Sequence, residues 1–361
     1  MQKPSKIDVF IFSKEKNYFS KVQEARLRRN LKSSLELNNV KHITNPIDEN
    51  IKIVHYLNFE DCNKFNYFKN KNFIKVVSVF LAEGDKKSRL IQKVKNKNTK
   101  ELENHINKKN IDILNSYDYV FAPSDLAKEF LEKEGVITRI KTLLPTVKLS
   151  KISLEDTDLA NLAYIYFHLE EGTKYFFIPL DYVNKEAAST VIELANKFKN
   201  YRFVVATHDA NSKEAKGVKK VFKKHPGNVI IVSNMEEDVY FSTIYRCSGF
   251  ILLNDIPLFI EEIMDAFAAK KPIFALKNSV FNDIAIDKVN AHVYNDFDSL
   301  VLGINEFDKG NLTDLTDKAY EFAYQNRVQN TGKKLIKLYN DMLEEKNIWS
   351  ILITSCKIKS M

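Results

Sequence analysis

Runs of consecutive apolar residues recur over residues 1–150 and alternate with segments whose apolar residues lie three and four positions apart. Continuous runs are typical of parallel strands covered on both faces, and the wider spacing is typical of amphipathic helices. The run at 6–12 predicts a first strand, and 20–39 predicts the helix after it. Further strands are predicted at 52–58, 73–81, 117–124 and 139–146.

A second series of the same kind follows the polar stretch 147–172, where we place a domain boundary. Strands are predicted at 174–180, 201–208, 228–233, 249–254, 272–277 and 291–295. Helices are predicted at 184–198, 212–227, 235–248 and 261–271. Two such series predict an α/β protein with two Rossmann-like, doubly wound parallel-sheet domains that face a cleft.

The predicted domains are 1–150 and 173–315. A long amphipathic helix is predicted at 316–346, and we expect it to pack back toward the N-terminal domain. Residues 347–361 form a tail without an assigned packing partner.

Composition narrows the protein class. The 361 residues are 44% hydrophobic and 28% charged, which is typical of a chain that buries a core. The formal net charge of +8 fits a nucleic acid, an anionic membrane or a phosphorylated ligand as partner. A generally lysine- and asparagine-rich composition explains the charge equally well. The three cysteines lie far apart, which favours a reducing compartment and argues against a zinc site.

No apolar run approaches the ~20 residues of a membrane-spanning helix. The N-terminal segment also holds too short an apolar run for a signal peptide. We therefore expect a cytoplasmic protein with at most peripheral contact to the inner face of the membrane.

Four stretches, in this order, resemble the GT-B nucleotide-sugar glycosyltransferases, specifically the retaining family that includes bacterial 1,2-diacylglycerol glucosyltransferases. "DAFAAKKPIFA" stands where that family has Glu-Ala-Met-Ala-x-Gly-x-Pro-Val-x-Ala, and "YDYVFAPS" resembles its Ala-Asp-x-Val-Ile-x-Pro-Ser strand. The stretches are 16–40 with 50–58, 117–136, 225–254 and 265–275.

The resemblance assigns the donor site, with departures. Of the family's Glu-x7-Glu pair, the second acid falls on Asp265 and the first on Pro257, with Asp255 and Glu261 as nearby substitutes. Asp265 is thereby implied to accept hydrogen bonds from the ribose hydroxyls. The alternative is that Asp265 is a partly exposed helix acid. Glu261 and Glu262 open the helix, where the helix dipole alone favours acids.

The donor diphosphate needs cations, since negative charge develops on the leaving group. The family's Arg/Lys pair falls near 184–185, so Lys185 is the one remaining cation; the alternative is a solvated lysine. The family's glycine-rich loop falls near 22–26, which reads "VQEAR" and contains no glycine.

The catalytic residue is not identified. The family's histidine falls near 79–81, where Glu83 and Asp85 are the only nearby catalytic candidates; they could also bind acceptor hydroxyls, and loop polarity is the alternative. His55 and His208 end predicted strands, where a cleft position and a structural position both remain open. No metal-ligand cluster or phosphate-binding Walker loop is visible.

The segment 86–109 holds nine lysines and arginines and two glutamates, with apolar residues between them. A basic amphipathic segment can lie on an anionic membrane surface, and a solvated basic helix is the alternative. Nucleic acid is not expected as a partner, because no aromatic stacking pattern accompanies the charge.

The resemblance implies transfer of a hexose from a nucleotide sugar, a UDP-sugar, to an acceptor such as a membrane glycolipid or diacylglycerol. It implies retention of anomeric configuration without a metal or other cofactor. The alternative is a catalytically inactive GT-B protein that acts as a binding or partner subunit. The missing glycine loop, histidine and first glutamate favour this alternative.

Overall fold

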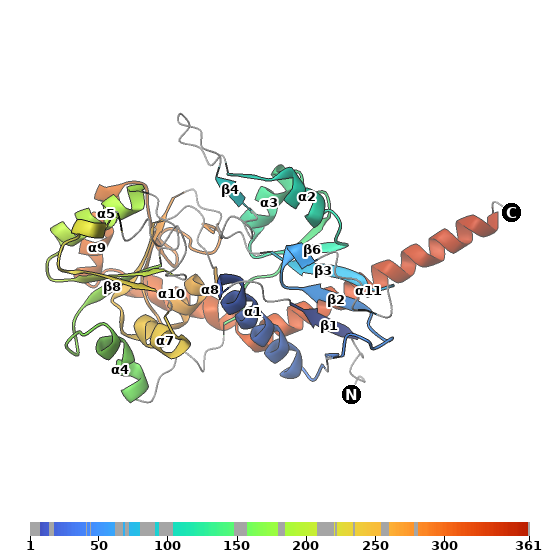
Figure 1. The fold of residues 1–361 in the computed structure, drawn as a ribbon, viewed down its shortest axis with the longest axis horizontal. Coiled ribbons are helices and arrows are strands. Elements are labelled where there is room, and N and C mark those ends of the chain that lie inside the picture. Colours follow the sequence, from blue (N-terminus) through green and yellow to red (C-terminus); the bar gives the residue numbers. More distant parts are fainter. Residues whose placement is uncertain are drawn as a thin grey trace.

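The chain folds into two α/β domains with helix α1 (Tyr18–Glu36) between them (Figure 1). The structure is a computed structural model. It describes residues 8–13, 18–40, 42–43, 45–61, 68, 72–79, 91–93, 104–147, 157–179, 185–207, 220, 222–233, 235–253, 260–277 and 281–359.

The N-terminal sheet has five parallel strands in the order β1-β2-β3-β6-β7. They are β1 (Val9–Phe12), β2 (Ile53–Tyr56), β3 (Ile74–Ser78), β6 (Tyr119–Ala122) and β7 (Arg139–Thr142). Just before β1, the carbonyl of Asp8 accepts a hydrogen bond from the backbone N–H of Ile53, which lies on the β2 side. The next carbonyl, that of Val9, accepts a hydrogen bond from the backbone N–H of Ile43. Because successive carbonyls of a strand point to opposite edges, Ile43 lies outside β1. The chain therefore reverses direction across the sheet at β1, which makes the sheet doubly wound.

Helices cover both faces of this sheet. On one face, α1 and α11 (Val328–Lys359) bury Leu31, Leu35, Leu335 and Tyr339 against β1, β2 and β3. On the other face lie the 3-10 turn η1 (Phe59–Asp61), α2 (Lys108–Leu114) and α3 (Asp125–Lys133). The side chain of Ser124 accepts a hydrogen bond from the backbone N–H of Ala127 and so caps α3.

The C-terminal sheet has six parallel strands in the order β10-β9-β8-β11-β12-β13, with its reversal between β8 and β11. The strands are β8 (Tyr175–Pro179), β9 (Arg202–Thr207), β10 (Val229–Ser233), β11 (Gly249–Leu252), β12 (Ile273–Leu276) and β13 (His292–Tyr294). One face carries α5 (Lys185–Lys197), η4 (Phe222–Lys224) and α9 (Phe297–Asp308). The other carries α4 (Thr157–Tyr166), α7 (Glu237–Arg246), α8 (Ile260–Ala268) and α10 (Thr313–Gln325). Together the two sheets confirm the expected fold class.

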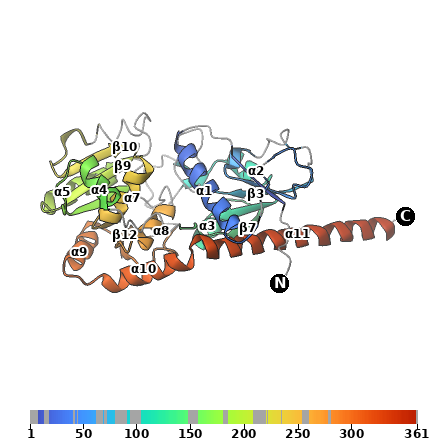
Figure 2. The same cartoon turned by 90° about the horizontal axis from the view of Figure 1, so that it is seen from below.

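Two helices occupy the region predicted as one helix at 316–346. α10 ends at Gln325, and α11 begins at Val328 and runs on to Lys359, through most of the predicted tail. The backbone of Val147, from the connection between the domains, is hydrogen-bonded to Asn326 and Val328 at this break. α11 then passes along the N-terminal domain, beside α1 (Figure 2).

One local expectation was wrong, and one alternative finds no support in the described residues. The stretch 147–172 is not irregular throughout, because α4 lies within it and buries Ala163 and Tyr164 beside α7. Within 86–109, the described residues form no helix before α2. Instead β4 (Ile91–Lys93) and β5 (Asn104–Ile106) pair as antiparallel strands.

Candidate functional site

Three carboxylates lie close together near the start of α8. This helix follows β11, at the point where the order of the C-terminal sheet reverses. Glu261, Glu262 and Asp265 are 6%, 3% and 1% exposed. An ionised carboxylate without a partner is costly to bury, so the contacts of these acids determine what the site can do.

Asp265 forms an ion pair with a residue of the N-terminal domain. The guanidinium Nη2 of Arg26, on α1, donates to Asp265 Oδ2 in a buried ion pair. The hydroxyl of Tyr240, on α7, donates to the same oxygen at 3.1 Å. The Arg26 guanidinium also lies 5.9 Å from the centre of the Tyr240 ring, within the range of a cation–π contact.

Burial controls the protonation of this cluster. Burial raises the pKa of Asp265, and the Arg26 charge opposes that rise. Burial also raises the pKa of Glu261 and of the Tyr240 hydroxyl. For Arg26, burial by itself lowers the pKa, but Asp265, Tyr240 and Glu261 outweigh it and the net direction is upward. Arg26, whose side chain is 14% exposed, is therefore a permanent cation among buried carboxylates.

A cavity of about 280 Å³ opens at this ion pair, between α1 and the helices of the C-terminal domain. Arg26, Arg29 and Asn30 line it from α1, and Glu237, Phe241 and Asp265 line it from α7 and α8. Arg29 pairs with Glu237 at 2.9 Å in a second, solvent-exposed ion pair between the domains. The cavity thus brings cations and carboxylates from both domains to one place.

This arrangement can bind a ligand that carries both hydroxyl and anionic groups. A carboxylate accepts hydrogen bonds from sugar hydroxyls, and a guanidinium forms paired hydrogen bonds with phosphate oxygens. Arg26 and Asp265 satisfy each other in this structure. A nucleotide bearing ribose and phosphate offers each of them a replacement partner.

The other predicted site residues are only partly located. Lys185 is the first residue of α5, the helix that follows β8. β8 and β11 are the two neighbouring strands between which the order of the sheet reverses. Its side chain, together with Glu83, Asp85, Asp255, Pro257 and His208, lies outside the described residues.

Of the two positions left open for His55, the structure shows the structural one. Its ring is fully buried, with Nδ1 2.6 Å from the Tyr339 hydroxyl and Nε2 2.8 Å from Ser78 Oγ. Burial lowers the pKa of His55 to about 3. The histidine is a neutral structural residue that links β2 and β3 to α11.

Sequence reasoning missed Arg26 and Tyr240. Arg26 ends the stretch 22–26, where the resemblance places a glycine-rich loop, but these residues lie inside α1. The lack of glycine there signalled only that this stretch departs from the resembled family. The partner of Arg26 is 239 residues away, and no pattern in the sequence connects the two.

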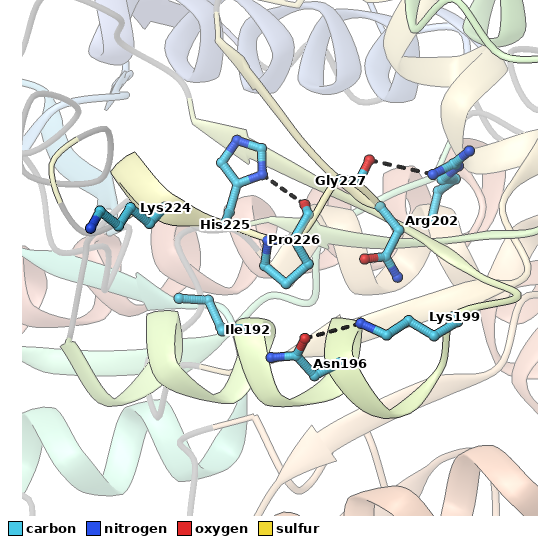
Figure 3. A pocket seen from close by; sticks show the side chains of 9 residues that line it. Ile192, Asn196, Lys199, Arg202, Lys224, His225, Pro226 and Gly227 are labelled. Atoms are coloured by element: carbon cyan, nitrogen blue, oxygen red, sulfur yellow. Dashed lines mark hydrogen bonds between the residues drawn. The ribbon is translucent and has the colours of Figure 1, made fainter.

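A second cavity, of about 640 Å³, is basic and lies elsewhere. Lys199, Arg202, Lys224 and His225 line it, between α5 and the segment that leads into β10 (Figure 3). Arg202 and Val229 are the first residues of β9 and β10, so this cavity lies at the amino ends of the strands. α8 begins beyond the carboxyl end of β11. The basic cavity is therefore at the opposite edge of the sheet and is not part of the candidate site.

Over the described residues, no group of three or more His, Cys, Asp or Glu side chains is arranged to hold a metal ion. In the same part of the chain, no helix is both long enough and apolar enough to span a membrane.

Two doubly wound sheets with a polar cavity between them define the GT-B glycosyltransferase fold, and the comparison of structures agrees. Three solved structures share the fold at 13%, 10% and 8% sequence identity. A glycosyltransferase from Rickettsia africae ESF-5 matches with a TM-score of 0.61 over 92% of this chain and 84% of its own. Anabaena Alr3699/HepE in complex with UDP and glucose matches with 0.65 over 93% and 99%. The trehalose-6-phosphate synthase OtsA matches with 0.59 over 87% and 76%.

No protein-family model matches the sequence, and no curated protein matches it. At such low identity the structural likeness shows the fold alone.

Proposed function

We propose that this chain transfers a hexose from a nucleotide sugar, a UDP-sugar, to an acceptor. The observation that carries the proposal is the buried Asp265, which lies where the C-terminal sheet reverses and faces α1 of the other domain. Ligands of doubly wound sheets bind beyond the carboxyl ends of the strands at such a reversal, where an acid binds ribose hydroxyls. The HepE structure with UDP and glucose supports this class of donor.

In the proposed complex, Asp265 binds the ribose, with Asp255 and Glu261 completing the donor contacts. Arg26 and Lys185 bind the diphosphate, because cations stabilise the charge that develops on the leaving group. The N-terminus of α5 adds a favourable dipole for the phosphate. Glu83 and Asp85 are the proposed contacts to the acceptor.

We base the acceptor, the stereochemistry and the cofactor requirement on the family resemblance. The acceptor is a membrane glycolipid or diacylglycerol, the anomeric configuration is retained, and no metal or other cofactor takes part. The protein would then act in the cytoplasm, at the inner face of the membrane, with the basic segment 86–109 toward anionic lipid.

A second function is favoured by the Arg26–Asp265 pair itself. Arg26 already neutralises the carboxylate that would hold the ribose, and a helix replaces the expected glycine loop at 22–26. A catalytically inactive protein that serves as a binding or partner subunit needs no free donor carboxylate.

The two functions separate when donor binding and turnover are measured on the same samples. Calorimetry with UDP-glucose measures binding, and UDP release with and without a diacylglycerol acceptor measures turnover. For the enzyme we expect both in the wild type and a loss of both in Asp265→Asn and Lys185→Ala.

Asp317→Asn is the control, since Asp317 is 56% exposed on α10 in a surface pair with Lys270. It should leave binding and turnover unchanged. Binding without turnover with donor and acceptor supports the inactive protein. Absence of UDP-glucose binding in the folded wild type would reject the proposed donor site.

A further inference from the structure

The basic cavity at the amino ends of β9 and β10 carries charge of one sign. Among the nine described residues that line it are Lys199, Arg202, Lys224 and His225, and none of the nine is an acid. Over the whole chain the 55 lysines and arginines are nearly matched by 47 acids. A cavity lined by cations without acids departs from that balance.

These cations contact only neutral groups. Lys199 Nζ donates to Asn196 Oδ1 at 3.0 Å, and Arg202 Nη1 donates to the carbonyl of Gly227 at 3.3 Å. Within the part of the chain that the structure describes, neither of them nor Lys224 forms an ion pair. All three are exposed, so their charge is available to a ligand from solution.

The cations are spread along the cavity. Lys224 lies at one end, and Lys199 and Arg202 lie toward the other (Figure 3). Ile192 and Pro226 lie between the two ends. A ligand that reaches the cations at both ends therefore needs more than one anionic group.

A buried amide fixes the walls of the cavity. Asn228 is 6% exposed, and its Nδ2 donates to the carbonyls of Ala195, Phe198 and Tyr201 at 2.9–3.2 Å. These bonds tie the end of α5 and the residue before β9 to the segment that enters β10. The cavity is therefore held by buried contacts and does not depend on how its exposed lysines are oriented.

Solvated surface lysines are the alternative explanation. The dipole of α5 favours a cation just beyond its end, which accounts for Lys199. It does not account for Arg202 at the start of β9 or for Lys224 on η4. Like charges from three elements repel when they share one cavity, and a bound anion removes that repulsion.

We propose that the basic cavity is a binding site for a small molecule that carries two or more phosphate groups. Guanidinium and ammonium groups both bind phosphate oxygens. The volume of about 640 Å³ is that of a small-molecule site. The cavity lies at the edge of the sheet opposite Asp265, so its ligand binds in addition to a nucleotide sugar. This site does not depend on the proposed function.

Calorimetry of the full-length protein with inorganic tripolyphosphate tests the site. We expect binding that added salt weakens. Inorganic phosphate, with a single anionic group, should bind at least about tenfold more weakly, since it cannot reach both ends of the cavity.

Two double variants locate the binding. Arg202→Gln with Lys224→Gln should weaken tripolyphosphate binding at least about tenfold, because one cation is lost at each end. The thermal midpoint should not change, since both side chains are exposed. Arg202→Lys with Lys224→Arg keeps both charges and should keep most of the affinity.

Two controls separate this site from general charge and from the donor site. Lys333→Gln with Lys337→Gln removes the same charge from exposed positions on α11. Arg26→Gln removes the cation of the candidate donor site. Both should retain tripolyphosphate binding at the basic cavity.

Four results would overturn the proposal. The first is no binding of tripolyphosphate to the wild type. The second is equal weakening by the Lys333 and Lys337 pair, which reduces the effect to net charge. The third is binding that Arg26→Gln abolishes and the Arg202 and Lys224 glutamine variant retains, which places it at the donor site. The fourth is tighter binding of a single-stranded oligonucleotide through Arg202 and Lys224, which makes the cavity part of a nucleic-acid surface.

Discussion

A largely buried ion pair, formed by Arg26 and Asp265, links the two domains. The Asp265 side chain is 2% exposed and that of Arg26 14%. Breaking such a pair from one side leaves an uncompensated buried charge, which costs about 3–5 kcal/mol. The pair therefore links the two domains and is also the place where a charged ligand would interact most strongly with the protein.

Replacing Arg26 tests which of these roles dominates. If Arg26 binds the donor diphosphate, Arg26→Gln should weaken UDP-glucose binding at least about tenfold, since a charge-assisted contact to phosphate is lost. It should also lower the thermal midpoint, because Asp265 loses its cation. Calorimetry and thermal unfolding measure the two effects.

The control is Arg29→Gln, one turn further along α1, whose exposed pair with Glu237 contributes about 1 kcal/mol or less. It should change neither quantity appreciably. Tighter UDP-glucose binding by Arg26→Gln would mean that Arg26 blocks Asp265, contrary to the proposed role.

His55 should make stability depend on pH. Its pKa is about 3 when folded, against about 6.5 when unfolded, so the unfolded chain binds an extra proton between these values. The His55 contribution to the free energy of unfolding is complete above pH 6.5. It falls toward pH 3 by up to about 1.4 kcal/mol per pH unit.

Urea unfolding of the wild type and of His55→Gln, measured between pH 7 and pH 4, isolates this slope as the difference between them. His225→Gln is the control, because His225 is exposed beside Pro226. Parallel pH profiles for the wild type and His55→Gln would contradict the assignment.

At the scale of elements, α1 has two roles. One side of it packs against α11, and its arginines reach the C-terminal domain. The contact with α11 is close at Gly332, where an added Cβ would collide with the Ser34 carbonyl and the Asn38 side chain. The Asn38 amide also donates to the Gln329 carbonyl at 3.1 Å across this contact. The packing of α1 on α11 thus sets where Arg26 is presented.

Gly332→Ala should therefore push the two helices apart. Overpacking of this kind costs about 1–3 kcal/mol, and we expect a lower thermal midpoint together with weaker UDP-glucose binding. Gly227→Ala is the control, because an added Cβ there meets no atom within 4 Å. An unchanged midpoint in Gly332→Ala would show that α1 and α11 are not held this closely.

At the scale of the whole molecule, α11 connects the two domains. It starts at the break after α10 and buries Leu335, Tyr339 and Met342 in the N-terminal domain. Val147 pairs with the backbone at the same break, so both chain crossings between the domains meet there. The relative position of the domains, and hence the Arg26–Asp265 pair, depends on this helix.

A chain that ends at Gln325 should lose this support. Without α11, the apolar residues that Tyr339 and its neighbours cover on one face of the N-terminal sheet become exposed to water. The loss of each large buried side chain lowers the free energy of unfolding by about 2–5 kcal/mol. We expect aggregation or a low-temperature unfolding step in circular dichroism. A chain ending at Asn347 keeps all these buried residues and should unfold like the wild type. Equal midpoints for the two chains would contradict this account.

The fold class and the succession of strands along the chain follow from local sequence patterns. Continuous apolar runs predict buried parallel strands wherever they occur, and each of those at 6–12, 52–58 and 174–180 contains an observed strand. α4 was predictable too, since Ala160, Ala163, Tyr164 and Phe167 have helical spacing, although polar neighbours obscured it. These elements could be predicted because each depends on the spacing of apolar residues within one short segment.

Which side chains meet depends instead on how the helices and sheets pack. It buried His55 between two hydroxyls, and it brought Arg26 to Asp265 across 239 residues of sequence. Neither contact follows from periodicity, because each depends on where α1 and α11 lie relative to both sheets. Asp265 could be singled out from its helix and the strand after it. Its ionic partner could not, since long-range pairing is set by packing between domains.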